Sequence, residues 1–268
     1  MNSNYSRANL KLFDRFSSDY DESFKLNPLG VLSRSRLLRY AKKQIGNNPK
    51  RILDIGCGTG EDALELLRLG HMVDCLDFSV GMMSITKQKI IKAGFQRVNF
   101  IVSDLNSMNY VPDNKYDCIY SNGVINFLDD IDKLPAYFCK ILKPGGLVFL
   151  TCLNKLCVRE MMYYLVRLKP LKMLRRFQNK GISYQKGYND IDCKLRYYDV
   201  SDFVQTIESK FEIIDIQPIC VLLPLSYQRY YSLLTKYYII TDRVELSKYL
   251  PSIFRYFGES FIIYMKMK

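Results

Sequence analysis

An apolar run, three alternate glycines and a helical pattern follow one another between residues 51 and 69. The first five residues, RILDI (51–55), form a compact apolar run that is typical of a buried strand. Gly56, Gly58 and Gly60 follow, and glycines at such a point let backbone N–H groups approach a ligand without side-chain obstruction. This stretch predicts an α/β fold with a site for a polar ligand in the turn.

Short apolar runs continue to alternate with amphipathic runs as far as residue 152, which is typical of β-α-β units around a mostly parallel sheet. We expect further strands at Met72–Leu76, Val98–Val102, Tyr116–Tyr120 and Leu147–Cys152. We expect helices at Asn4–Tyr20, Gly30–Ile45, Glu61–Leu69, Val80–Ala93 and Asp129–Leu142, with Ser79 and Gly94 capping the fourth. Later elements are a helix at Asp199–Ser209, a strand at Phe211–Val221, a Tyr-rich helical segment and a last strand at Ser260–Met267.

The alternation of short apolar and amphipathic runs ends after residue 152. Leu153–Phe177 is a basic amphipathic stretch interrupted at Pro170, and the pattern predicts no strand in the next forty or so residues. We therefore interpret 1–48 as an N-terminal helical cap and 49–268 as one α/β domain. Within that domain, 153–198 is interpreted as an insertion on the substrate side.

Charge is distributed unevenly along the chain. The formal net charge is +12, yet residues 51–150 hold ten basic and twelve acidic groups, while residues 155–180 hold eight basic and one acidic. Three interpretations of 155–180 remain open. A lid helix that roofs the pocket is favoured over an interfacial helix on anionic lipid, and phosphate-backbone binding to RNA comes third.

Two cofactors compete for the glycine turn. Gly58, Gly60 and Ala63 satisfy the G-x-G-x-x-G/A pattern of dinucleotide sites, and Asp77 is placed to serve an NAD ribose. Asp54 instead completes D-x-G-x-G-x-G. The sole Tyr-x-x-x-Lys begins at Tyr264, in the expected last strand, so the sequence offers no helical pair for a hydride step.

With these residues the chain resembles the class I S-adenosylmethionine-dependent methyltransferases, in particular small-molecule members with a type 11-like domain. The resemblance covers about residues 50–153. It rests on ILDIGCGTGEDA (52–63), Asp77 at the end of the second strand, VSDLNSM (102–108), YDCIYSNGVINFLDD (116–130) and LKPGGLVFL (142–150). The family implies a Rossmann-like, doubly wound sheet of seven strands whose last strand is antiparallel.

The resemblance implies S-adenosyl-L-methionine as the cofactor, and it places eleven residues around it. Its methionine end would lie on the glycine turn, its ribose on Asp77 and its adenine beside Asp104. Tyr20, in FDRFSSDYDESF (13–24), would cover the sulfonium, where a π face attracts a cation. The full set is Tyr20, Asp54, Gly56, Gly58, Gly60, Asp77, Phe78, Met82, Asp104, Leu105 and Ser121.

No catalytic residue is assigned, because methyl transfer mainly requires an aligned nucleophile and exclusion of water. The [DN]-P-P-[YF] motif of adenine and glutamine N-methylation is replaced by residues 121–124, and Asn126 and Phe127 stand where many small-molecule members carry His. We expect a small apolar or anionic acceptor, lipid-, quinone- or natural-product-like, with O-methylation slightly favoured. The alternatives are an RNA methyltransferase and a non-catalytic cofactor-binding or membrane-associated adaptor.

Eight Cys are scattered without a C-x-x-C pair, and the single His, His71, is expected to cap a turn. Reduced core cysteines and no metal site follow from this pattern. No run reaches the roughly 18 apolar residues of a spanning helix, and the N-terminus lacks a signal-peptide pattern. We expect a cytoplasmic protein, with peripheral contact at the inner membrane face as an alternative and nucleic acid as a less favoured partner.

Overall fold

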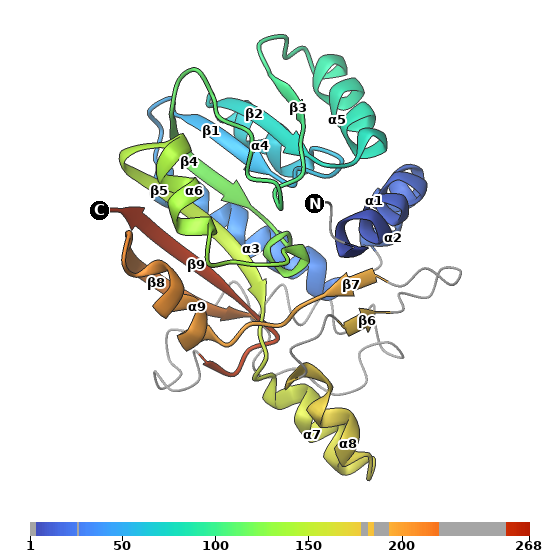
Figure 1. Ribbon diagram of the computed structural model, residues 1–268. Helices are drawn as coiled ribbons and strands as arrows, with labels where there is room; N and C mark the ends of the chain where they lie inside the picture. Colours follow the sequence, from blue (N-terminus) through green and yellow to red (C-terminus); the bar gives the residue numbers. More distant parts are fainter. Residues whose placement is uncertain (1–3, 26, 178–181, 185–192, 220–255) are drawn as a thin grey trace.

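A seven-stranded sheet forms the centre of the computed structural model, which describes residues 4–25, 27–177, 182–184, 193–219 and 256–268 (Figure 1). The strand order is β3-β2-β1-β4-β5-β9-β8. The first five strands are parallel, and β9 runs antiparallel between β5 and β8. The bounds are β1 Arg51–Ile55, β2 Met72–Asp77, β3 Phe100–Val102, β4 Tyr116–Ser121, β5 Leu142–Leu153, β8 Phe211–Ile219 and β9 Ser260–Met267. The Rossmann-like sheet with an antiparallel last strand is confirmed.

Helices cover both faces of this sheet. Side chains from α3 (Pro28–Ile45), α4 (Glu61–Arg68) and α5 (Val80–Lys92) join one buried apolar cluster. Side chains from α6 (Leu134–Ile141) and α9 (Val200–Ile207) join the cluster on the opposite face. The order of strands reverses between β1 and β4, which is where open α/β sheets bind ligands.

Both expected caps of α5 are confirmed. The Ser79 side chain accepts a hydrogen bond from the Met82 amide at 3.1 Å. At the other end Gly94 has φ +90° and donates to the Ile91 carbonyl, an arrangement that satisfies carbonyls of the last turn. These local signals fixed the direction in which α5 leaves the end of β2.

Several predicted boundaries are wrong. The helix expected from Asp129 begins only at Leu134, and residues 125–127 form a 3₁₀ turn, η2. Strand β5 begins at Leu142 rather than Leu147, because the Lys143–Gly146 segment stays in the strand across an irregularity in its pairing with β4. β3 begins at Phe100 rather than Val98.

The N-terminal segment and the insertion differ from expectation as well. The first expected helix is divided into α1 (Asn4–Phe16), a 3₁₀ turn and α2 (Tyr20–Lys25). The insertion, predicted to lack strands, contains the antiparallel pair β6 (Ile182–Tyr184) and β7 (Cys193–Leu195). Strands of three residues are too short to show an alternating pattern. The expected Tyr-rich helical segment lies outside the described residues.

The N-terminal helices are attached to the loops at the carboxyl ends of β1 and β2. The Asp14 carboxylate accepts from the Ser79 hydroxyl at 2.5 Å and the Gly81 amide at 3.1 Å. Asp21 accepts from the Thr59 hydroxyl at 2.6 Å and from Lys89 at 2.8 Å. Acidic side chains of the cap therefore hold it against the glycine turn and the start of α5.

The insertion begins with a helical hairpin that extends away from the sheet. It consists of α7 (Val158–Val166), α8 (Pro170–Met173) and the 3₁₀ turn η3 (Leu174–Phe177), at the lower edge of Figure 1. Within the described part of the chain, no helix has the length and apolar character needed to cross a membrane.

Six described cysteines carry free thiols, five of them buried, which agrees with the expectation of reduced core residues. His71 is also buried, and its Nδ1 accepts weakly from the Lys50 amide at 3.4 Å. It lies at the start of β2, at the opposite end of that strand from Asp77. The structure therefore gives His71 the turn-capping position expected from the sequence.

Candidate cofactor and acceptor site

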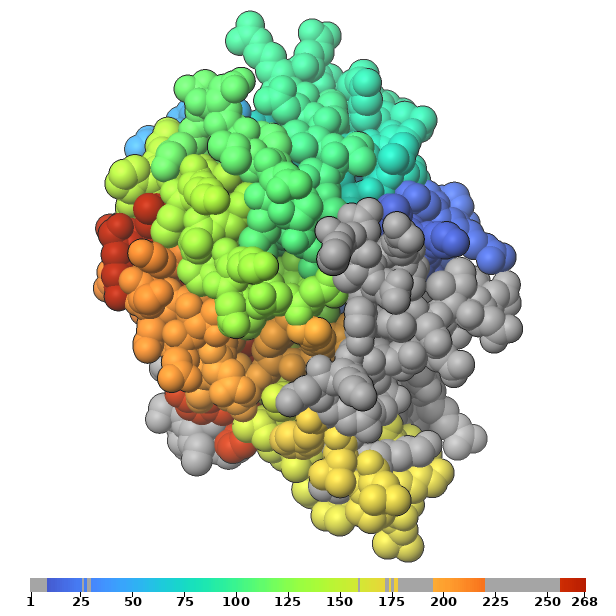
Figure 2. All heavy atoms as spheres, in the orientation of Figure 1, coloured from blue at the N-terminus to red at the C-terminus, as the bar shows by residue number. Residues whose placement is uncertain are grey.

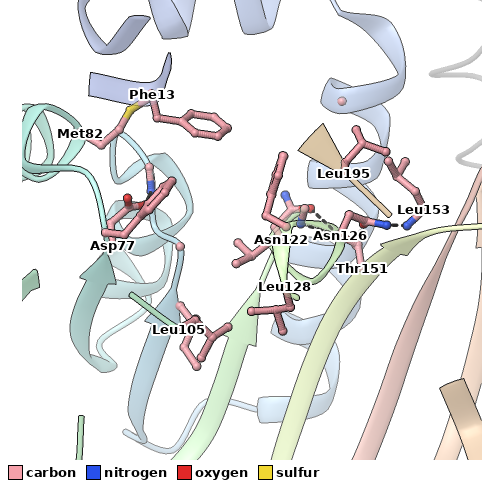
Figure 3. Close-up of a pocket in the computed structure, with 18 of the residues that line it drawn as sticks. Phe13, Asp77, Met82, Leu105, Asn122, Asn126, Leu128, Thr151, Leu153 and Leu195 are labelled. Carbon is pink, nitrogen blue, oxygen red and sulfur yellow. Dashed lines mark hydrogen bonds between the residues drawn. The ribbon is translucent and has the colours of Figure 1, made fainter. Parts of the chain in front are cut away.

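A cavity of about 580 Å³ opens at the carboxyl ends of β1, β2, β4 and β5, beneath the N-terminal helices (Figure 3). Asp77 and Met82 line one end of it, Leu153 and Leu195 line the other, and Leu128 lies between them (Figure 3). The strand ends supply the floor, while α1, α2 and α3 supply the cover. We describe the two ends as the Asp77 half and the Leu153 half.

The three glycines of the turn have different roles. All have positive φ, at +69°, +57° and +79° for Gly56, Gly58 and Gly60. A Cβ on Gly56 would lie 2.1 Å from a methyl group of Val124, and one on Gly60 would lie 2.7 Å from the Thr86 methyl. A Cβ on Gly58 would meet nothing within 4 Å, and Gly58 lines the cavity. Gly56 and Gly60 therefore permit close packing, whereas Gly58 leaves open space.

Asp77 ends β2 with its carboxylate at the cavity. One oxygen accepts from the Gly58 amide and the other from the Ser79 amide, both at 2.9 Å. Only 5% of the residue is exposed, and burial raises the pKa of Asp77 to about 6 despite these hydrogen bonds. The carboxylate retains acceptor capacity toward a ligand, because two oxygens offer about four lone-pair positions.

The remaining predicted residues divide into two groups. Tyr20, Phe78, Met82, Asp104 and Leu105 line the cavity together with Gly56, Gly58 and Asp77. The other three, Asp54, Gly60 and Ser121, are not among the lining residues.

Asp54 and Ser121 lie behind the cavity wall. Asp54 is 2% exposed, its Oδ2 has no hydrogen-bond partner, and burial raises its pKa well above the usual range. The Ser121 hydroxyl donates to the Ile55 carbonyl at 3.1 Å and joins β4 to β1. The structure thus places these two side chains outside the cavity lining, in the buried interior of the sheet.

Tyr20 is the first residue of α2 and belongs to an aromatic group over the cavity. Its ring stacks on Phe24 at 5.8 Å between centroids, and Phe16 meets it edge-on at 6.2 Å. Burial raises the pKa of the Tyr20 phenol, so it remains neutral at physiological pH. A neutral, fixed ring of this kind suits contact with a cation.

Apolar side chains surround the Leu153 half. Phe13 lies between the two halves, edge-on to Phe78 at 5.8 Å and to Phe127 at 5.4 Å between ring centroids, and Leu128, Leu153 and Leu195 continue the wall beyond Phe127. Apart from Phe78, these side chains come from α1, η2, the following turn, β5 and β7, segments far apart in the sequence.

The polar groups among these apolar residues are already bonded to each other. The Asn126 Oδ1 accepts from the Leu153 amide at 2.9 Å, and its Nδ2 donates to the Arg196 carbonyl at 2.5 Å. The Thr151 hydroxyl donates to the Asn122 side chain at 2.9 Å and accepts from the Gly123 amide at 2.7 Å. This half is therefore suited to a ligand with a substantial apolar part.

Arg34 lines the cavity and was missed by the sequence analysis. Its guanidinium carbon lies 3.9 Å from the centroid of the Phe24 ring, and its Nε lies 3.4 Å from the Asp62 carboxylate without hydrogen-bond geometry. Arg34 is one of ten basic residues in the first fifty, and no motif separates it from the others. Only its position on α3, which crosses the cavity, reveals it.

The lid interpretation of residues 155–180 is wrong for the described hairpin. None of the described side chains of α7, α8 and η3 is among the cavity-lining residues. An amphipathic pattern shows that a helix has an apolar face, but it does not show what covers that face. The cover comes instead from α1, α2 and α3.

Comparisons with known proteins agree with this geometry. Residues 52–146 match the methyltransferase domain family. Malonyl-[acyl-carrier protein] O-methyltransferase 1 of Ilyobacter polytropus is 33% identical over 168 residues, which cover 62% of this chain and 59% of that protein. A ubiquinone biosynthesis O-methyltransferase of Xylella fastidiosa is 26% identical over 62% of this chain and 70% of its own length.

Solved structures share the fold. The N-methyltransferase NodS of Bradyrhizobium japonicum, in complex with S-adenosyl-L-homocysteine, aligns with a TM-score of 0.59 at 11% identity, over 96% of this chain and 97% of NodS. A putative S-adenosylmethionine-dependent methyltransferase of Listeria monocytogenes gives 0.62 at 14% identity, over 88% and 99% of the two chains.

Residues 52–146 are a methyltransferase domain, and the sheet of the chain has the fold of the solved S-adenosylmethionine-dependent methyltransferases. S-adenosyl-L-methionine is the cofactor of this class. The chain spans 59% and 55% of the lengths of the two malonyl-[acyl-carrier protein] O-methyltransferases that it matches in Ilyobacter polytropus.

Proposed function

We propose that this protein transfers a methyl group from S-adenosyl-L-methionine to an oxygen atom of a small, apolar or anionic acceptor. The observation that carries the proposal is the single cavity with two unlike halves. Its Asp77 half combines a glycine turn with strand-end carboxylates, and its Leu153 half is apolar. A ligand in each half would bring the two reactants together in a site that excludes water.

We propose specific roles for the residues of the Asp77 half. Asp77 would accept hydrogen bonds from the ribose hydroxyls, and Asp104 and Leu105 would border the adenine. Gly58 leaves room for the ligand beside the turn, and Tyr20 would place its ring against the sulfonium. When bound, the cofactor supplies an electrophilic methyl group, and these residues orient it.

Arg34 would bind the carboxylate of the cofactor's methionine part, because it is a cation that lines the cavity and its Nε forms an ion pair with Asp62 at 3.4 Å that holds it there. Binding of S-adenosylhomocysteine and of methylthioadenosine, which lacks the amino-acid part, separates this role from a general effect. Arg34→Gln should weaken only the former, by about 1.5–3 kcal/mol. Equal losses for both ligands would remove Arg34 from the carboxylate site.

The groups around the cavity favour an acceptor that is already ionised. Asp77, Asp104 and Glu259 are the only carboxylates among the described lining residues, and His and Lys are absent from that set. Glu259 accepts a hydrogen bond from Arg176 at 2.7 Å, and this ion pair makes it a poor general base. A carboxylate or acidic phenol needs no base to become a nucleophile. The O-methyltransferases of malonyl-[acyl-carrier protein] and of ubiquinone biosynthesis among the relatives support this choice.

The proposal is tested by incubating the purified protein with methyl-labelled S-adenosylmethionine and a fractionated extract. We expect label in an organic-soluble or small anionic product. A base-labile methyl ester would identify a carboxylate oxygen as the acceptor, and a base-stable methyl ether would identify a phenolic oxygen. Asp77→Ala, with folding checked by circular dichroism, is the negative control. Binding of S-adenosylhomocysteine without turnover on any fraction would instead indicate a non-catalytic subunit.

The structure of the hairpin gives less support to RNA binding than its tyrosines and basic residues suggest. The rings of Tyr163 and Tyr164 meet each other at 5.3 Å between centroids, and the Arg167 guanidinium lies 4.6 Å from the Tyr163 centroid. These rings therefore already have partners instead of open faces on which bases could stack. Label recovered in RNA would nevertheless overturn the small-molecule proposal.

A further inference from the structure

The tip of the α7–α8 hairpin, residues 158–177, exposes large apolar side chains. Leu168 is 89% exposed, Leu171 82% and Val166 70%. Further exposed apolar residues on the hairpin are Val158, Met162, Leu165, Leu174 and Phe177. Figure 2 shows this region, in yellow, protruding at the lower edge of the molecule. A cluster of this kind on a protruding surface indicates an interaction site rather than a scattered surface residue.

The backbone at the tip presents leucine where a polar residue or glycine would serve the fold better. Leu168 has φ +54°, a left-handed conformation that L-residues other than Gly, Asn and Asp adopt rarely. Its amide donates to the Leu165 carbonyl and ends α7, and Pro170 then begins α8. An almost fully exposed leucine in this conformation contributes nothing to the core.

Positive charge also lies at the apolar tip. Residues 155–180 hold eight Lys and Arg and a single acidic residue, Glu160. Glu160 forms an ion pair with Arg176, whose Nε donates a hydrogen bond to it at 2.6 Å. Arg167 and Lys169 flank Leu168 and are exposed. The surface near the tip is therefore both apolar and cationic.

The base of the hairpin is joined to the Leu153 half of the cavity through Arg176, which is 3% exposed. Its guanidinium donates to the Glu259 carboxylate and to the Asn154 carbonyl, both at 2.7 Å. Its Cζ also lies 4.4 Å from the centroid of the Tyr197 ring. Glu259 and Tyr197 line the cavity, so the hairpin is fixed to the wall that faces the proposed acceptor.

We propose that the α7–α8 hairpin docks on an anionic lipid bilayer, with Leu168 and Leu171 inserted and with Arg167 and Lys169 at the headgroups. A protruding tip whose apolar side chains lie beside the exposed cations Arg167 and Lys169 matches an anionic lipid surface in charge and polarity, and it needs no shaped partner. Docking would bring the Leu153 half of the cavity close to a surface that concentrates apolar acceptors. Only this consequence rests on the proposed function.

The test is co-sedimentation of the full chain with vesicles of phosphatidylcholine alone or with phosphatidylglycerol. We expect sedimentation only with the anionic vesicles, and a loss of binding as salt is raised. Leu168→Ser combined with Leu171→Ser should abolish it, and Arg167→Gln or Lys169→Gln should each lower the partition coefficient about fivefold. Val111→Ser and Lys87→Gln, at exposed positions outside the hairpin, are the matched controls and should change nothing.

Absence of sedimentation with anionic vesicles would overturn the proposal, as would equal binding by the leucine variant. Sensitivity to the charge variants alone would also overturn it, because that result indicates an acidic protein or RNA surface. S-adenosylhomocysteine affinity reports folding of every variant. Vesicle binding without methyl transfer would refute the proposed function and leave the docking proposal intact. Methyl transfer without vesicle binding would refute the docking proposal and leave the proposed function intact.

Discussion

Gly58→Ala should weaken cofactor binding far more than it weakens the fold. At this position a Cβ would enter the open space of the cavity, since it meets no protein atom within 4 Å. Gly94 provides a matched control, because it also has positive φ, and a Cβ there also meets nothing within 4 Å. Gly94 lies beyond the C-terminus of α5, outside the cavity lining.

Both substitutions strain the backbone, which has φ +57° at Gly58 and +90° at Gly94. Placing alanine in the left-handed region costs about 1–2 kcal/mol, so both variants should lose roughly that much stability. At about 2–4 °C per kcal/mol for a chain of this size, both melting temperatures should fall by about 2–8 °C. Only Gly58→Ala adds a methyl group where the ligand would lie. Overpacking of about 1–3 kcal/mol predicts a loss of binding of roughly 5- to 150-fold.

Calorimetric titration with S-adenosylhomocysteine and thermal unfolding without ligand measure the two effects separately. We expect both variants to melt at a lower temperature, with Gly94→Ala lowered at least as far as Gly58→Ala, and a weakened dissociation constant for Gly58→Ala alone. Unchanged binding by Gly58→Ala would show that the turn does not hold the cofactor. Equal weakening by Gly94→Ala would show that the loss of affinity arises from stability rather than from the site.

Three further perturbations follow from the structure. Because burial raises the pKa of Asp77 to about 6 and ribose hydroxyls would bind its ionised form, S-adenosylhomocysteine affinity should be complete above that pH and fall up to tenfold per unit below it. The same raised pKa should make the unliganded fold more stable as the pH falls from about 6 to about 4. Binding titrations and thermal melts at several pH values measure how affinity and stability change with pH. An affinity that does not change with pH would contradict the assignment of Asp77 to the ribose. Tyr20→Ala should weaken binding of S-adenosylmethionine by about 0.5–2 kcal/mol more than binding of S-adenosylhomocysteine, whose sulfur carries no charge, whereas Tyr20→Phe should not. An equal loss for both ligands would argue for packing alone. Arg176→Met should lower the free energy of unfolding by about 3 kcal/mol, because Glu160 and Glu259 lose their buried partner; an unchanged urea midpoint would show that this network does not stabilise the fold.

The central fold could be predicted because its signals are local. The apolar run at 51–55, the glycines that follow and the capping residues around α5 each act within a few residues, and they recur in the order of a parallel sheet. The side chain of Asp77 could be placed at the cavity for the same reason. It ends a strand whose neighbours also end there, so its position follows from the sheet itself.

The direction of a side chain within a motif was harder to predict. Asp54 and Ser121 belong to the strands that carry the motifs, yet their side chains are buried behind the cavity. Successive side chains of a strand point to opposite sides, and a strand that is buried on both faces has no polar alternation from which to read the direction. The start of α6 was misplaced because the acidic residues at 129–132 form a turn rather than a first helical turn.

The sequence by itself determined the sheet, the glycine turn and the class of cofactor. Tertiary structure decided the rest of the site. It brought Arg34 from α3 and the apolar residues from α1, η2, β5 and β7 around one cavity, and it turned the basic hairpin away from that cavity. The physical reason is range: backbone turns and caps depend on neighbouring residues, whereas the acceptor wall and the surface left exposed depend on packing between segments more than a hundred residues apart.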